Sequence, residues 1–211
     1  MKLATPPFSY PSPIASKPGE PVWEVARLYP AQGEWSEEAY LELDKAGNTL
    51  IEFTDGYVEM LPMPTVEHQR IVMCMVLALN EFSRPGKLGE VFTAPLPLKL
   101  RTRVYREPDI IFVLQQNRPK GNYPERADLV VEVVSAGKAN RVRDVNTKRL
   151  EYAAAGIPEY WIVDPKDGQI TVLKLDGKTY IEHGVFKKGA TATSALLNGF
   201  SVDVTKALAA D

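Results

Sequence analysis

The sequence predicts a mixed α/β (α+β) fold, in which a mixed central sheet is flanked by helices and a β-hairpin lies near each end of the folded region. Three observations support this class. Asp-Gly pairs separate apolar runs at residues 55–56 and 176–177, which is a strong hairpin signal. Apolar residues recur at helical spacing between residues 65 and 82. Residues 128–134 are apolar on both faces, as expected of a central strand covered from two sides.

The length of 211 residues is enough for one well-buried core and favours one main domain. Residues 1–24 hold six prolines, which disfavours helix and sheet, so we expect an extended arm followed by a single domain over residues 25–211. Apolar residues make up 45% of the chain and charged residues 25%, the balance of a water-soluble protein. No signal peptide or membrane-spanning run is evident, so we expect a cytoplasmic protein that does not contact membranes.

In the first half of the chain, a short helix should run from Ser36, a suitable N-cap, to about Lys45. Strands at 49–53 and 57–61 should form the first hairpin around Asp55-Gly56. A helix then begins after Thr65 and continues to about Phe82, where its apolar face should cover a sheet.

In the second half, the sequence predicts a strand meander over 90–94, 96–100 and 108–114, then a loop over 115–126. The central strand at 128–134 follows. A helix from about 143 to 155 leads to a strand at 159–163, and strands at 170–175 and 179–183 form the terminal hairpin.

Glu132 interrupts the most strand-like run in the sequence. Alternation places it on the same face as Val130 and Val134, where an ionised carboxylate costs several kcal/mol unless it is paired or bound to a cation. Asp109 repeats the pattern directly before the apolar run 110–113, in a strand that should neighbour the first. Asp109 is therefore a second buried acid whose charge requires a counterion or a bound cation.

Two carboxylates on adjacent strands repel each other, and a hard divalent cation with oxygen ligands relieves that repulsion. Mg²⁺ or Mn²⁺ held by Asp109 and Glu132 fits best. The alternative is that each acid pairs with an arginine, for example Arg103 or Arg106 for Asp109. The positions of these residues leave both interpretations open.

Lys148 lies three residues after Val145 and four before Tyr152, which places it on the sheet-facing stripe of its helix. An ammonium group that faces the interior requires a carboxylate, and it could stabilise negative charge developing on a phosphate. The alternative is a surface pair with Asp144, one helical turn earlier.

His68 and Glu52 are further candidates. His68 lies on the inward side of the long helix, where a histidine that only completes the core is the commoner case. Glu52 points away from Ile51 and Phe53, either outward to solvent or as a third acid of the site. Cys74, the only cysteine, is expected to fill the core.

The net charge of −2 gives no global sign of a polyanionic partner, so any contact with nucleic acid must be local. Basic stretches around residues 99–106 and 138–149 could supply it, although such runs are usually solvated faces. Aromatic residues in the proline-rich arm favour docking on a partner subunit, which suggests a homodimer.

Five segments, taken in order, carry a family resemblance. They are residues 51–56 (IEFTDG), 68–72 (HQRIV), 107–113 (EPDIIFV), 128–135 (DLVVEVVS) and the block from 143 to 164. Together they resemble the Uma-two family of putative restriction endonucleases (DUF820-like), a branch of the PD-(D/E)xK nuclease superfamily. The resemblance covers the chain from about Ser36 to Val204.

This resemblance implies a restriction-endonuclease-like fold and metal-dependent hydrolysis of phosphodiester bonds by an endonuclease, with DNA as the favoured substrate. It assigns Asp109 and Glu132 as ligands of Mg²⁺ or Mn²⁺, and it adds Glu52 and His68 as residues with functional roles. Arg101, Arg103, Arg141 and Arg149 would hold the flanking nucleic-acid backbone.

The sequence departs from the superfamily motif at Val134, where a lysine would be expected two residues after Glu132. The family pattern implies that Lys148, from the following helix, replaces it. This departure and the acidic pI of about 5.8 also fit a catalytically inactive binding or assembly protein that retains the nuclease fold.

Overall fold

The computed structural model describes residues 29–46, 50–135 and 146–209. The helices in these ranges are α2 (Glu37–Ala46), α3 (Val66–Ser83), α5 (Lys148–Ala154) and α6 (Val204–Ala209), with a short 3₁₀ turn η1 (Gln115–Asn117). None of these helices has the length and apolar character needed to span a membrane. The predicted arm at 1–24 and the predicted beginning of the helix at 143 lie outside the described residues.

A six-stranded sheet forms the centre of the fold, in the order β10-β9-β8-β7-β6-β3. Its strands are β3 (Gly89–Thr93), β6 (Ile110–Leu114), β7 (Leu129–Val133), β8 (Glu159–Asp164), β9 (Gln169–Asp176) and β10 (Thr179–Lys187). β7 and β8 run parallel, joined by the crossover that contains α5, and the other neighbours are antiparallel. The prediction of a mixed central sheet flanked by helices is confirmed.

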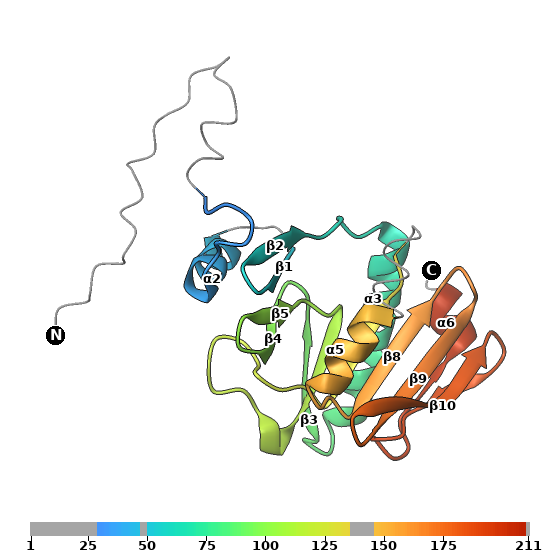
Figure 1. Ribbon diagram of the computed structural model, residues 1–211. Helices are drawn as coiled ribbons and strands as arrows, with labels where there is room; N and C mark the ends of the chain where they lie inside the picture. Colours follow the sequence, from blue (N-terminus) through green and yellow to red (C-terminus); the bar gives the residue numbers. More distant parts are fainter. Residues whose placement is uncertain (1–28, 47–49, 136–145, 210–211) are drawn as a thin grey trace.

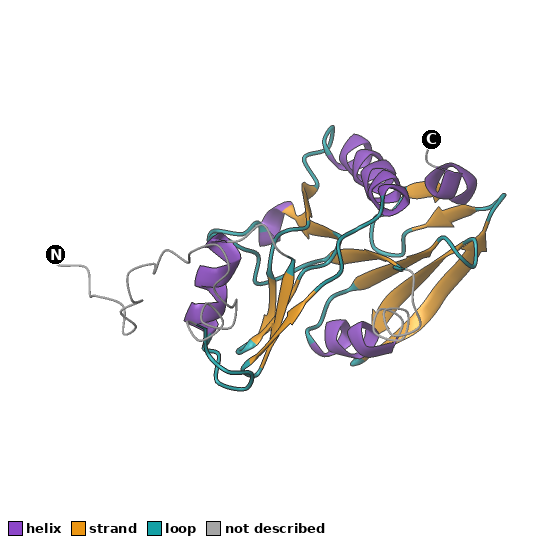
Figure 2. Ribbon diagram, turned by 90° about the horizontal axis from the view of Figure 1, so that it is seen from above, coloured by secondary structure: helices purple, strands orange, loops and turns teal. Residues whose placement is uncertain are grey.

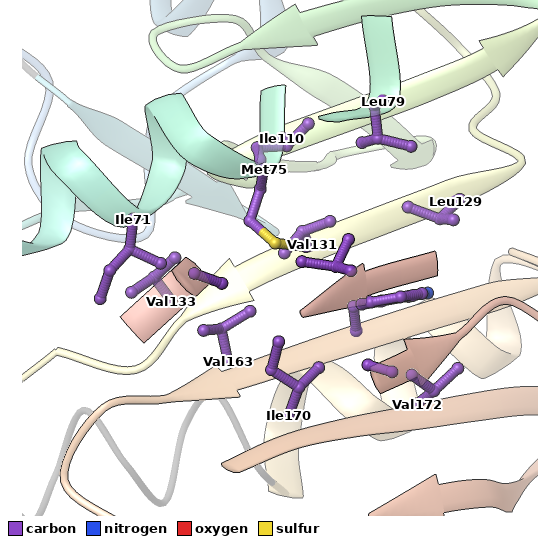
Figure 3. Close-up of a cluster of buried hydrophobic side chains, with 14 of the residues drawn as sticks. Ile71, Met75, Leu79, Ile110, Leu129, Val131, Val133, Val163, Ile170 and Val172 are labelled. Carbon is purple, nitrogen blue, oxygen red and sulfur yellow. The ribbon is translucent and has the colours of Figure 1, made fainter. Parts of the chain in front are cut away.

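Helices α3 and α5 cover opposite faces of this sheet (Figure 2). The inward side chains of α3, such as Ile71 and Met75, pack on Val131 and Val133 of the central strand (Figure 3). Val130 points to the opposite face, where it joins a second cluster with Tyr152 of α5. β7 is therefore apolar on both sides, as its sequence indicates, and Glu132 belongs to the α5 side by alternation.

A smaller antiparallel sheet lies beside the large one in the order β2-β1-β5-β4 (Figure 1). Its strands are β1 (Ile51–Thr54), β2 (Tyr57–Met60), β4 (Leu98–Arg101) and β5 (Val104–Arg106). The first hairpin forms as predicted, with positive φ angles of 48° at Asp55 and 100° at Gly56 that suit an Asp-Gly turn. Helix α2 packs on this sheet through Tyr40, and the Ser36 Oγ accepts a hydrogen bond from the Ala39 amide, as expected of an N-cap.

The predicted meander over residues 90–114 is wrong in its connections. β3 and β6 pair with each other in the large sheet, whereas β4 pairs with β5 in the small one. The short strand β5 was not predicted, because a turn at Arg103 with φ 62° separates it from β4 by only two residues. Pro108 then ends the ladder, since it has no amide hydrogen, and the chain crosses from β5 into β6 of the other sheet.

The C-terminal part extends beyond the predicted terminal hairpin. β9 and β10 form that hairpin, and β10 continues to Lys187, farther than the sequence indicated. A two-stranded unit of β11 (Thr191–Thr193) and β12 (Ser201–Asp203) and the helix α6 were not predicted. α6 packs with α3 over the same face of the large sheet (Figure 2).

Glu159 anchors the loop that enters β12. Its carboxylate is fully buried at the beginning of β8. It accepts hydrogen bonds from Trp161 Nε1 at 2.6 Å, Ser194 Oγ at 2.7 Å, and the amides of Ala195 at 2.6 Å and Leu196 at 2.7 Å. This buried charge is thus matched by four donors.

We expect Glu159→Ala to lower the free energy of unfolding by about 2–4 kcal/mol, because the buried Trp161 Nε1 and three part-buried donors lose their acceptor. Denaturant unfolding measures the change. Glu182→Ala, at an exposed position of β10, is the control and should change stability by less than about 0.5 kcal/mol. A loss below about 1 kcal/mol in Glu159→Ala would show that these hydrogen bonds do not stabilise the loop.

Candidate active site

Asp109 directly precedes β6, and Glu132 belongs to β7, the antiparallel neighbour of β6. The register pairs Ile110 with Val131, so its continuation by one residue places Asp109 opposite Glu132. Both of the acids that the sequence singled out line one pocket at this end of the central strands.

Glu132 receives two donors from α5. Lys148 Nζ lies 2.8 Å from its Oε1 atom, and the Tyr152 hydroxyl lies 2.5 Å from the same oxygen. Glu132 is 4% exposed and Lys148 is 2% exposed. Burial, with the charge of Glu132, raises the pKa of Tyr152 well above its usual value, so this hydroxyl stays protonated and donates. The predicted inward orientation of Lys148 is confirmed, and the alternative partner Asp144 lies outside the described residues.

Glu52 is buried, so the outward-facing alternative for this residue is wrong. Its Oε1 atom lies 3.4 Å from Lys148 Nζ, and its Oε2 atom lies 3.7 Å from Nε of Arg106. The ammonium of Lys148 is therefore placed between two carboxylates, Glu132 from the large sheet and Glu52 from the small one. The role of Glu52 as a third acid near a metal stays a prediction.

Asp109 is held by a histidine and a backbone amide. Its Oδ2 atom lies 3.2 Å from His68 Nε2 and accepts a hydrogen bond from the Val133 amide at 2.7 Å. His68 occupies the first turn of α3, where the Thr65 side chain caps the helix by accepting from the His68 amide. The predicted pairing of Asp109 with Arg103 or Arg106 is wrong. Arg106 faces Glu52 and Glu151, and the guanidinium of Arg103 donates to the Trp35 carbonyl.

A pocket of about 240 Å³ opens at this end of the sheet. Its polar lining includes Asp109, Glu132, Lys148 and His68. The rim is apolar and is formed mainly by the segment from Leu61 to Pro64, which joins β2 to α3. The four side chains thus meet at a space that a small ligand can enter.

The donor set fits a cation that keeps much of its water shell. Mg²⁺ is commonly held by one or two carboxylates and several waters, and Asp109 and Glu132 supply two carboxylates from opposed positions. Among the residues that the structure describes, no group of three or more histidine, cysteine, aspartate or glutamate side chains is arranged as a metal cage.

Glu107 is a further acid of the pocket that the sequence interpretation left out. It is buried in the segment that crosses from β5 to β6. Burial and the nearby carboxyl of Asp44 raise the pKa of Glu107 to about 8. At neutral pH this group is mainly a neutral carboxylic acid beside the charged ones.

Three of the arginines expected to bind nucleic acid, Arg101, Arg103 and Arg149, lie in the described part of the chain and do not line the pocket. Arg101 forms a two-point contact with Asp55, at 2.8 and 3.2 Å. The guanidinium of Arg103 donates to the Trp35 carbonyl, and that of Arg149 donates to the Tyr180 carbonyl. Arg141 lies outside the described residues. Their contact with a nucleic-acid backbone stays a prediction.

Besides Glu107, the sequence interpretation gave no role at the site to Glu151 and Tyr152. It considered Arg106 as a partner of Asp109, whereas the structure places Arg106 against Glu52 and Glu151. Glu151 and Tyr152 follow Lys148 by three and four positions, so helical spacing could have placed them beside it. Arg106 carries no comparable local signal, since its role depends on a strand pairing between distant parts of the chain.

The architecture is that of a nuclease-like fold. A crystal structure of a putative nuclease belonging to DUF820 from Anabaena variabilis is similar, with a TM-score of 0.62 over 76% of this chain and 90% of the other, at 18% sequence identity. No curated protein matches the chain.

Residues 37–205 match the model of the Uma2 family, described as "putative restriction endonuclease". The chain therefore belongs to the Uma2 family, which confirms the resemblance found in its sequence.

Glu107 should make stability depend on pH. Its pKa is raised in the folded state, so the stabilisation is fully present below the unfolded pKa and is lost as pH rises toward 8. Glu107→Gln stays neutral throughout. We therefore expect the variant to gain stability over wild type by on the order of 2–4 kcal/mol between pH 5 and pH 8.

Urea unfolding of both proteins at the two pH values measures this difference. Glu125→Gln, on an exposed loop, is the control and should show no change with pH relative to wild type. If Glu107→Gln and wild type differ by the same amount at both pH values, Glu107 does not retain its proton in the folded state.

Proposed function

We propose that this chain is a Mg²⁺- or Mn²⁺-dependent endonuclease that hydrolyses phosphodiester bonds of nucleic acid, with DNA as the favoured substrate. The observation that carries the proposal is that Asp109, Glu132 and the buried Lys148 line one pocket. The family description supports a nuclease, and nucleic acid is the substrate of that class.

In this proposal Asp109 and Glu132 hold the cation, as two hard oxygen ligands. A divalent cation in such a site polarises a phosphate oxygen and lowers the pKa of water. Lys148 supplies positive charge for the phosphate as negative charge develops on it. His68 keeps the Asp109 carboxylate oriented, because it contacts the same oxygen that the backbone amide holds.

Contact with the rest of the substrate would come from Arg101, Arg103, Arg141 and Arg149. With a net charge of −2, attraction for a polyanion must depend on such local groups. We also propose that the protein acts in the cytoplasm as a homodimer, in which the proline-rich arm contacts the partner subunit.

A second candidate function is that of a non-catalytic binding or assembly protein. The observation in its favour is the direct contact of Lys148 with Glu132 at 2.8 Å, which already neutralises one of the two carboxylates. The pocket beside them argues against complete closure. The two candidates differ in whether wild-type protein binds Mg²⁺ or Mn²⁺ at this site.

We expect Asp109→Ala to abolish binding of Mn²⁺ and to lower the cleavage rate by about 100-fold or more, because one of two cation ligands is lost. Calorimetric titration with Mn²⁺ measures binding. Cleavage is measured with Mg²⁺ on plasmid DNA, single-stranded DNA and RNA, which also identifies the substrate.

Glu125→Ala, which removes an exposed acid away from the pocket, is the matched control and should behave as wild type. Cleavage by Asp109→Ala at the wild-type rate would assign the activity to a contaminant. Wild-type protein that neither binds Mn²⁺ nor cleaves any of the three substrates would favour the binding or assembly protein.

A further inference from the structure

The ammonium of Lys148 has two carboxylates within reach, and they come from different sheets. Glu132 belongs to β7 of the large sheet, whereas Glu52 belongs to β1 of the small sheet. Both are almost completely buried. A lysine placed in this way can remain neutralised if one of the two carboxylates takes another partner.

Strand register places Glu52 beside the charge of Arg106. β1 and β5 pair Phe53 with Tyr105, so the same register continued by one residue places Glu52 opposite Arg106. Side chains at opposed positions share a face, and Arg106 Nε lies 3.7 Å from the Glu52 carboxylate. The Glu107 amide also lies 3.4 Å from Glu52 Oε1.

Arg106 is itself held firmly. It donates through Nε at 2.8 Å and Nη2 at 2.6 Å to the two carboxylate oxygens of Glu151, a bidentate pair. Its Nη1 atom donates to the carbonyls of Phe53 and Tyr105. Burial lowers the pKa of Arg106, but the hydrogen bonds of Glu151 and the charge of Glu52 outweigh this, so its pKa is raised and it stays charged.

Glu151 and Lys148 lie on the same helix, α5, one turn apart. The pair of Arg106 and Glu151 therefore joins α5 to the small sheet at the point where Lys148 meets Glu52. These contacts form a continuous series of alternating charges: Glu151, Arg106, Glu52, Lys148 and Glu132.

We propose that Glu52 is a positioning residue that retains the Lys148 ammonium in the pocket when a divalent cation takes Glu132 as a ligand. The inference rests on the function proposed above. Without Glu52, Lys148 and the cation would compete for the Glu132 carboxylate. With Glu52, the lysine has a second counterion at 3.4 Å and stays beside the site where the phosphate binds.

A different role for Glu52 would be direct coordination of the cation as a third carboxylate. The two roles are separable, because positioning acts through Lys148 and coordination does not. Removal of the Glu52 charge should weaken cation binding only when Lys148 is present, if Glu52 is a positioning residue.

The experiment is calorimetric titration of Mn²⁺ into wild type, Glu52→Gln, Lys148→Met and the double variant. We expect Glu52→Gln to weaken Mn²⁺ binding about tenfold, because Lys148 then competes fully for Glu132. Lys148→Met should bind Mn²⁺ at least as tightly as wild type. In the Lys148→Met background, Glu52→Gln should change the affinity by less than about twofold.

Glu125→Gln removes an equal charge from an exposed loop and controls for the overall electrostatic field. Thermal unfolding reports whether each variant folds. If Glu52→Gln does not fold, Glu52→Asp is used instead, because it keeps the charge but moves it away from Lys148 by one methylene. We expect Glu52→Asp to weaken Mn²⁺ binding less than Glu52→Gln would. In the Lys148→Met background this loss of Mn²⁺ affinity should disappear.

Equal weakening by Glu52→Gln in both backgrounds would overturn the proposal and make Glu52 a cation ligand. The proposal would also be overturned if Glu52→Gln bound Mn²⁺ as tightly as wild type. Glu52 would then have no effect on the cation and would serve only as a buried counterion. Wild-type protein that does not bind Mn²⁺ would overturn the proposed function together with this inference.

Discussion

The buried ammonium of Lys148 is the interaction on which the arrangement of the site depends. A charged group with 2% exposure loses most of its hydration, and that cost is offset only when good counterions are in place. Glu132 and Glu52 provide them from two separate sheets, so the small sheet, the large sheet and α5 must all be correctly placed to bury it. The same contacts would leave unpaired charges in any packing that moves one of these elements, which makes them a constraint on the whole fold.

The crossing from β5 to β6 explains why the pocket forms where it does. β5 belongs to the small sheet and β6 to the large one, and only three residues, Glu107-Pro108-Asp109, lie between them. Pro108 cannot donate to a ladder, so pairing stops on both sides of it. The acids at its two sides, Glu107 and Asp109, both line the pocket together with Glu132, and the carboxyl of Asp44 lies near Glu107.

Elements with a strong local signal were predictable from sequence. The first hairpin, α3 and the central strand each carry a turn, a cap or a periodic pattern, and Glu132 stood out because it breaks an apolar strand. β5 and its partner β1 were not predictable together, because their pairing joins distant segments and β5 has three residues. The environment of Glu52 follows from that pairing, so the sequence could leave its orientation open but could not identify Arg106 as its neighbour. The predicted beginning of the α5 helix at 143 falls outside the described residues, and β11, β12 and α6 are too short to give a periodic signal.

Packing also gives a reason for a lysine on the helix rather than on the strand. Val134, where the superfamily motif has a lysine, is buried in the cluster that includes Val130 and Tyr152. A long cationic side chain there would replace apolar contacts of this cluster with an ammonium group. Delivery from α5 avoids this conflict, because Lys148 reaches Glu132 from above the sheet while its helix also supplies Tyr152 to the same oxygen. The strand can then remain apolar, and the charge is held by a helix that Arg106 and Glu151 join to the second sheet.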